Sequence, residues 1–148
     1  MKIALGADHA GYDLKTILVD TLREWGHEVV DLGTGNATES VDYPDFGSAV
    51  GHHVARGDAD LGVAVCGSGI GISIAANKVP GVRAALVHDA TSARLAREHN
   101  HANVLCMGAR LIGPPVAQDA LAAWLGAEPV EGRHLARVEK LSQLDHRA

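Results

Sequence analysis

Aromatic residues and cysteines are both scarce in this 148-residue chain. Only 3% of its residues are Phe, Trp or Tyr, and its two cysteines are Cys66 and Cys106. Two cysteines are too few for the disulfide framework of a small secreted domain. The chain also lacks an apolar run near the roughly 18 residues that span a bilayer, and its first residues show no signal-peptide pattern. These absences predict a soluble, cytoplasmic protein that does not bind membranes.

A long basic segment is missing as well. The formal net charge is -5 at pH 7, which argues against electrostatic binding of nucleic acid, although a local basic cluster can still bind a small anion. Hydrophobic residues make up 47% of the chain, and no linker, low-complexity tract or repeat interrupts it. A length typical of one domain therefore predicts a single domain over residues 1–148.

Short apolar segments alternate with helical patterns along the chain. Five segments rich in β-branched residues predict buried strands at residues 2–6, 28–32, 61–66, 82–87 and 103–108. An amphipathic helix is expected after the first strand, up to Gly26, and others are expected after Pro44, Gly69, Asp89 and Pro115 and over about 133–144. This alternation predicts an α/β protein, a three-layer α/β/α Rossmann-like fold with a five-stranded parallel sheet.

Two loops are expected beyond the carboxyl ends of the strands, where α/β proteins bind their ligands. The segment "GADHAG" follows the first strand and contains Asp8 and His9, and "CGSGIG" follows the third strand and contains Cys66 and Ser68. If these two strands are neighbours, the loops face each other across one crevice. The sequence leaves that adjacency open.

The glycine-rich loop after Cys66 differs from the common phosphate-binding motifs. A dinucleotide fingerprint has the spacing G-x-G-x-x-G, whereas this loop has G-x-G-x-G, although Asp89 lies near the distance of a ribose-binding acid. A cysteine-dependent phosphatase would need an arginine where Ile72 stands, and Lys78 comes too late for a Walker loop. The remaining interpretation is an anion hole made of peptide N–H groups at a helix start, beside a thiol.

The two cysteines have different surroundings in the sequence. Free cysteines are usually small packing residues, and Cys106 inside "NVLCMG" keeps that interpretation. Cys66 instead ends a strand at the start of a helix, where the helix field favours the reactive thiolate. We therefore predict that Cys66 is chemically active.

The nine histidines show no metal-binding pattern. His52 and His53 are adjacent in a predicted helix, so their side chains diverge. His99 and His101 form an H-x-H without a cysteine or carboxylate at ligand spacing. We predict no metal and no cofactor.

Five segments resemble, in order and spacing, the characteristic segments of the type B ribose-5-phosphate isomerase family: "GADHAGYDLK", "DYPDF", "CGSGIGISIAANK", "REHNHANVL" and "GRHLARV". The family also includes allose- and galactose-6-phosphate isomerases. The resemblance implies a metal-free interconversion of aldose and ketose phosphates, in the pentose phosphate pathway when the substrate is ribose 5-phosphate. It also implies homodimers or homotetramers with active sites shared between subunits, and we expect the C-terminal helix to pack on a partner subunit.

The resemblance implies a role for each site residue. Cys66 is the base that moves a proton between C2 and C1 through an enediolate, and His99 opens the sugar ring with Asp8 as its partner. Ser68 stands where the family often has threonine, and Ile72 stands where another branch has a glutamate base. The implied substrate contacts are Gly67, Gly69 and Gly71 at the enediolate, Tyr43 and Asn100 at the sugar, and His9, Arg110, Arg133, His134 and Arg137 at the phosphate.

The residue types support the same chemistry. Isomerisation needs a base, donors for an oxyanion and a group that opens the ring, which a thiolate, backbone amides and a histidine can supply. Arg133 and Arg137 share one helical face with Lys140, and on spacing alone such a face is solvated. Two functions stay open: an isomerase of ribose, allose or galactose phosphates, and a non-catalytic nucleotide-binding module.

Overall fold

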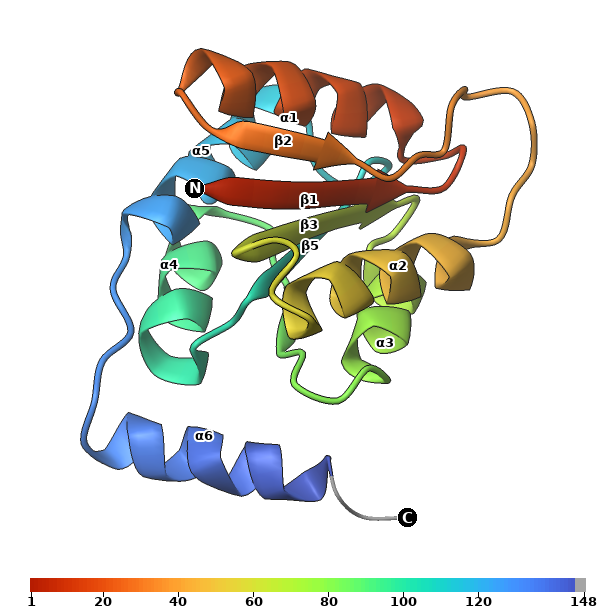
Figure 1. Ribbon diagram of the computed structural model, residues 1–148. Helices are drawn as coiled ribbons and strands as arrows, with labels where there is room; N and C mark the ends of the chain where they lie inside the picture. Colours follow the sequence, from red (N-terminus) through yellow and green to blue (C-terminus); the bar gives the residue numbers. More distant parts are fainter. Residues whose placement is uncertain (146–148) are drawn as a thin grey trace.

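The computed structural model describes residues 1–145. At its centre is a five-stranded parallel sheet in the order β2-β1-β3-β5-β4, with helices on both faces (Figure 1). The strands are β1 (Lys2–Ala7), β2 (Glu28–Asp31), β3 (Leu61–Cys66), β4 (Ala84–Leu86) and β5 (Val104–Gly108). The helices are α1 (Tyr12–Glu24), α2 (Tyr43–Ala55), α3 (Ile70–Asn77), α4 (Ala90–Asn100), α5 (Pro114–Gly126) and α6 (Arg133–Leu144). The predicted α/β fold with a five-stranded parallel sheet is confirmed.

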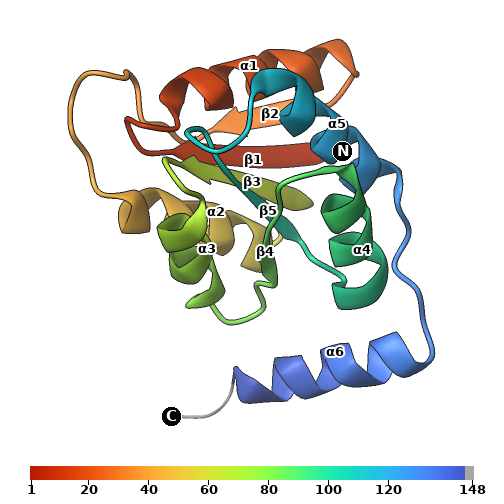
Figure 2. The same ribbon diagram turned by 180° about the vertical axis from the view of Figure 1, so that it is seen from behind.

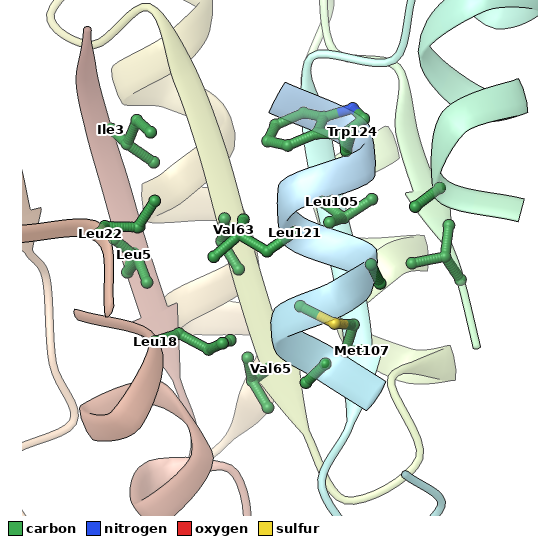
Figure 3. Packing of buried hydrophobic residues seen from close by; sticks show 14 of the residues in the cluster. Ile3, Leu5, Leu18, Leu22, Val63, Val65, Leu105, Met107, Leu121 and Trp124 are labelled. Carbon is green, nitrogen blue, oxygen red and sulfur yellow. The ribbon is translucent and has the colours of Figure 1, made fainter. Parts of the chain in front are cut away.

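One face of the sheet packs against α1, α4 and α5. Val63 and Val65 of β3 point to this face and meet Leu18 of α1 and Leu121 and Trp124 of α5 (Figure 3). All five side chains are 4% exposed or less, and Trp124 is completely buried. Burial of these large apolar groups is the main force that holds this helical layer on the sheet.

The opposite face packs against α2 and α3. Ala64 and Cys66 alternate with the valines of β3 and point to this side, where they meet Cys106 of β5, Val50 of α2 and Ile72 of α3. A strand covered on both faces must be apolar at every position. This explains the uninterrupted run "LGVAVC" and places Cys66 between the sheet and α3.

The two edge strands differ from the sequence prediction of buried strands. Residues of β2 are half-buried or exposed, and β4 covers Ala84–Leu86 rather than residues 82–87. Each of these strands has a neighbour on one side only. At β4 the side chain of Asn77 takes the place of a missing strand, since its Nδ2 donates to the Ala84 carbonyl at 2.9 Å and its Oδ1 accepts from the Ala84 amide at 2.8 Å.

Helix α6 lies outside the two helical layers, after an extended segment at residues 127–132 (Figures 1 and 2). Val138 is its buried residue, whereas Leu141 is 43% exposed and Leu144 is 49% exposed. An amphipathic helix normally covers its apolar stripe. The packing of this helix on a second subunit remains a prediction, and the incomplete burial of these leucines is in keeping with it.

An ion pair between a buried lysine and a partly exposed aspartate joins α1 to the end of β2. The side chain of Lys15 is 2% exposed, and its Nζ lies 2.6 Å from Oδ1 of Asp31. Burial opposes the charged form of this carboxyl, but hydrogen bonds from Lys15 and from the Gly33 amide outweigh the burial. The pKa of Asp31 is therefore below its ordinary value of 3.8. This pair stabilises the folded chain at neutral pH.

Replacing Asp31 with Asn is expected to lower the free energy of unfolding at pH 7 by about 1 to 2 kcal/mol, since Asp31 is only partly buried. A carboxyl with a depressed folded-state pKa adds stability above its unfolded-state pKa, and this stability disappears as pH falls through the folded-state value. The difference between the two proteins should therefore shrink below about pH 4. Urea unfolding from neutral to acidic pH measures it, and a difference that stays constant with pH would contradict the assignment.

Candidate active site

Cys66 lies at the end of β3, directly before the turn into α3. Its side chain is 4% exposed, and the amide of Gly69 donates a hydrogen bond to its Sγ at 3.1 Å. Gly69 has φ of 76°, in the left-handed region, and a Cβ there would lie 2.7 Å from the carbonyl carbon of Met107. A residue with a side chain would be strained and would clash. Glycine therefore lets the turn bring a backbone N–H onto the thiol, where it stabilises negative charge.

The thiol opens onto a cavity of about 330 Å³. Both of the predicted loops line it, because β1 and β3 are adjacent parallel strands and their carboxyl ends meet at one edge of the sheet. The adjacency that the sequence left open is therefore present. The lining residues are Asp8, His9 and Ala10 from the first loop, Cys66, Gly67, Ser68 and Gly71 from the second, and Tyr43, Arg110 and Leu111.

Backbone amides orient the two polar residues of the first loop. Asp8 is 7% exposed, and its Oδ1 accepts the Gly11 amide at 3.0 Å. His9 is half-buried, and its Nδ1 accepts the Val41 amide at 3.1 Å. A neutral imidazole that accepts at Nδ1 carries its proton on Nε2. Val41 therefore selects the tautomer that leaves an Nε2–H free to donate to an anion or a hydroxyl group.

Tyr43 and Arg110 contribute a phenol and a cation to the same cavity. The ring of Tyr43 lies over Gly71, where a Cβ would come within 2.5 Å of it. The guanidinium of Arg110 lies beside Gly67, and the Arg110 amide donates to the Gly67 carbonyl at 2.9 Å. A side chain at position 71 would overlap the Tyr43 ring, whereas one at position 67 would press only on the flexible end of Arg110, so the steric demand for glycine is stronger at Gly71.

Besides Gly69, five of the predicted site residues lie outside this cavity. They are His99 and Asn100 at the end of α4 and Arg133, His134 and Arg137 on α6. Helix α4 runs back along the sheet, so its last turn ends just before β5 begins (Figure 2). Cys66 pairs with Gly108 at the other end of β5. At about 3.3 Å per residue, the strand separates the two places by at least about 13 Å.

His99, Arg133, His134 and Arg137 form a second cluster with a basic character, whereas Asn100 lines a separate cavity beside the end of α6. The rings of His99 and His134 are stacked, with centroids 4.2 Å apart and planes within 4° of each other. Desolvation lowers the pKa of His134, and the charges of His99, Arg133 and Arg137 lower it further. Such a group of cations repels added protons and attracts an anion. The structure thus places the predicted site residues mainly in two groups, one around the thiol and one around the histidine pair.

Comparison with known proteins identifies the family. The chain matches the family model described as Ribose/Galactose Isomerase over residues 3–141. It belongs to this family. Ribose-5-phosphate isomerase B of Escherichia coli is 47% identical over 146 residues, which cover 99% of this chain and 97% of the relative. The D-erythrulose-4-phosphate isomerase of Pectobacterium atrosepticum is 42% identical over 146 residues, covering 99% and 96%.

The fold of this isomerase-family chain also matches solved structures. Ribose-5-Phosphate Isomerase B of Clostridium thermocellum superposes with a TM-score of 0.96 at 50% sequence identity, covering 98% of this chain and 97% of that one. The predicted family and the prediction of a sugar-phosphate isomerase are confirmed. Similarity to these proteins does not by itself assign the roles of individual residues or the preferred sugar of this chain.

Cys106 has different surroundings from Cys66. The sequence predicted a packing role for Cys106. It is completely buried and does not line the cavity. Burial raises the pKa of the Cys106 thiol, and the neighbouring Cys66 raises it further. A thiol that stays protonated is a poor base and nucleophile. These observations support a packing role for Cys106.

The described residues contain neither a metal-binding cluster nor a membrane-spanning helix. Among residues 1–145, no group of three or more His, Cys, Asp or Glu side chains is arranged to hold a metal ion. Within the same range, no helix combines the length and the apolar character that crossing a membrane would require.

Sequence reasoning missed one residue that shapes the site, and a second residue makes a contact that the sequence did not indicate. Val41 acts through its backbone amide, which every residue except proline possesses, so no residue type could have indicated it. Gly69 was predicted to cover the enediolate, but it does not line the cavity, and its amide donates to the thiol of Cys66 instead. Both effects depend on how the loops close.

Proposed function

We propose that this chain interconverts ribose 5-phosphate and ribulose 5-phosphate through an enediolate, a reaction of the pentose phosphate pathway. The observation that carries the proposal is the Cys66 thiol, which faces a cavity of sugar-phosphate size with a backbone N–H 3.1 Å from its sulfur. It occurs in a chain that is 47% identical to a relative named ribose-5-phosphate isomerase B. Membership of an isomerase family favours this activity over the non-catalytic nucleotide-binding alternative.

Cys66 is assigned the proton transfer. Its thiolate removes the C2 proton of the open-chain aldose, and the electron pair moves through C1 to the carbonyl oxygen, which gives an enediolate. The hydroxyl proton on O2 passes to the O1 oxyanion, and the same thiol returns its proton to C1 as the C2 oxygen becomes the ketose carbonyl. Ser68, Gly67 and Gly71 line the cavity at the start of α3 and are positioned to donate hydrogen bonds to the developing oxyanion. Asp8 is assigned the sugar hydroxyl groups.

The second group of residues, on α4 and α6, is assigned the opening of the sugar ring and part of the binding of the phosphate. His99 is too far from Cys66 along β5 to serve the same sugar within one chain. We infer that a complete site combines the Cys66 cavity of one subunit with His99, Asn100, Arg133, His134 and Arg137 of another, in a homodimer or homotetramer. Leu141 and Leu144 of α6 support this assembly, since they are 43% and 49% exposed within one chain and contact with a second copy would bury them.

A mixing experiment tests the shared site. With ribose 5-phosphate as substrate, Cys66→Ala and His99→Asn homodimers should each have about 1% of native activity or less, but a heterodimer of the two contains one site with both native residues. Co-expression at equal levels makes about half of the dimers mixed, each with one intact site of two, so activity should recover to about a quarter of the native value. Sedimentation should also show a dimer or larger oligomer.

The control mixes two differently tagged Cys66→Ala chains, which should stay inactive. Persistent inactivity in mixtures that contain purified heterodimers would contradict the shared site. A fully active monomer in sedimentation would contradict it as well.

The length of the sugar is tested by comparing substrates. The family description names both ribose and galactose, and one relative is named a D-erythrulose-4-phosphate isomerase. Relative kcat/KM for ribose 5-phosphate, allose 6-phosphate, galactose 6-phosphate and erythrulose 4-phosphate ranks the candidates. We expect ribose 5-phosphate to rank first. Inactivity with all four, together with tight nucleotide binding, would overturn the proposed function.

A further inference from the structure

Lys15 is a buried charge to which the proposed reaction assigns no role. The residue is 1% exposed, and its Nζ lies 2.6 Å from Asp31 Oδ1, donates to the Thr34 carbonyl at 3.0 Å and lies 5.2 Å from the centre of the Tyr12 ring. Lysine is almost never buried unless it is paired, because desolvating an ammonium is costly. An apolar side chain of similar volume often stabilises a protein as well as a buried pair does. Stability alone therefore does not account for this residue.

The partners of Lys15 lie on a segment that is bonded to the end of β1. The Ala7 amide donates to the Gly33 carbonyl at 2.8 Å, and the Thr34 amide donates to the Ala7 carbonyl at 2.8 Å. Ala7 directly precedes Asp8 and His9 of the cavity. Lys15 lies in the first turn of α1, directly after the loop that carries Asp8 and His9. Its side chain reaches residues 31–34, which are bonded to Ala7 directly before that loop. The contacts of Lys15 therefore tie together the two ends of the loop that carries Asp8 and His9.

The same anchor lies at the start of the exposed loop 35–42. Thr34 is 8% exposed and is held by Lys15, whereas residues 35–40 are exposed. At the far end of this loop, the Val41 amide donates to His9 Nδ1 at 3.1 Å, and Tyr43 follows at the start of α2. The position of Val41 against His9 therefore depends on how firmly the loop is fixed at Thr34.

We propose that Lys15 is a positioning residue for His9. By anchoring residues 31–34, it holds both the loop that carries His9 and the loop that carries Val41, and so keeps the Nε2–H of His9 directed at the substrate. Lys15 touches neither substrate nor reacting atoms, and its kinetic effect rests on the proposed isomerase function. The effect of Lys15 on the orientation and tautomer of the His9 ring is independent of that function.

The first test is kinetic. Lys15→Met keeps the volume and removes the ammonium, so KM for ribose 5-phosphate should rise about 10- to 100-fold, while kcat stays within about threefold because the Cys66 turn is untouched. Lys2→Met is the matched control. Lys2 of β1 also pairs with a carboxylate of β2, Glu28, but at 3.9 Å and in an exposed position. This control should leave both constants within about twofold of native.

A double-mutant cycle distinguishes positioning from general loosening of the fold. If Lys15 acts through His9, adding Lys15→Met to a His9→Asn chain should change KM by less than about threefold. A structural role would produce the same 10- to 100-fold loss in both backgrounds, and that result would overturn the proposal.

The second test reads the His9 ring directly and needs no activity. In ¹⁵N spectra of the histidine side chains, His9 is identified by its loss in His9→Asn. The native protein should show the Nε2–H tautomer, and Lys15→Met should show a mixture of tautomers. An unchanged tautomer would overturn the proposal. Should Lys15→Met fail to fold, Asp31→Asn weakens the same anchor from its partly exposed end and should produce a smaller shift in the same direction. A chain that isomerises no sugar phosphate defeats the proposed function, while the ring measurement still decides the role of Lys15.

Discussion

Replacing Cys66 with alanine is expected to lower kcat by about 1,000- to 10,000-fold and to leave the fold intact. The sulfur is the assigned base, and the Gly69 amide donates a hydrogen bond to it at 3.1 Å. Steady-state rates with ribose 5-phosphate and with ribulose 5-phosphate should fall together, because both directions pass through the same proton transfer. A thiol-alkylating reagent should inactivate the native protein, and substrate should protect it.

Cys106→Ala is the matched control for this experiment. It makes the same chemical change in the same apolar cluster, but its thiol is completely buried and lies outside the cavity. We expect it to lower the free energy of unfolding by about 1 kcal/mol and to change kcat by less than about threefold. A Cys66→Ala chain with activity comparable to that of Cys106→Ala would show that Cys66 is a packing residue as well.

Replacing His99 with Asn is expected to affect the two directions of the reaction unequally. Ribose 5-phosphate exists mainly as a closed furanose, so it needs ring opening before its C2 proton is accessible. Ribulose 5-phosphate cannot close the corresponding ring, because its C5 oxygen carries the phosphate. The initial rate from the aldose should therefore fall about 100-fold or more, as is typical for loss of an acid–base group, and the rate from the ketose should fall far less.

Initial rates measured in both directions decide the role of His99. The equilibrium constant cannot change, since an enzyme alters barriers only, so the asymmetry must appear before product accumulates. Cys66→Ala serves as the control that slows both directions alike. Equal losses from the two substrates would mean that His99 serves the enediolate step or supports the His134 stack, and its assignment to ring opening would then be wrong.

The sequence was sufficient for the order of the elements and for the chemical character of the Cys66 loop. Strand and helix periodicities are local, and a five-strand alternation with short connections allows few arrangements. The glycines around Cys66 were informative because a left-handed turn and close contacts with Tyr43 and Met107 permit no side chain. Sequence was less reliable at the sheet edges, where β2 and β4 contain β-branched or apolar residues but have one unpaired side and are not fully buried.

Tertiary structure alone decided which residues share a site. Asp8 and Cys66 are 58 positions apart, and only the β1–β3 pairing brings their loops to one cavity. The predicted site residues of α4 and α6 fall at the opposite end of β5, since a helix that follows a parallel strand returns to the edge where the strands begin. The amide of Val41 and the ammonium of Lys15 act through loop closure, which depends on contacts between distant segments. Periodicity records which side of an element is apolar, whereas a site depends on distances between elements, and those are set only when the layers pack.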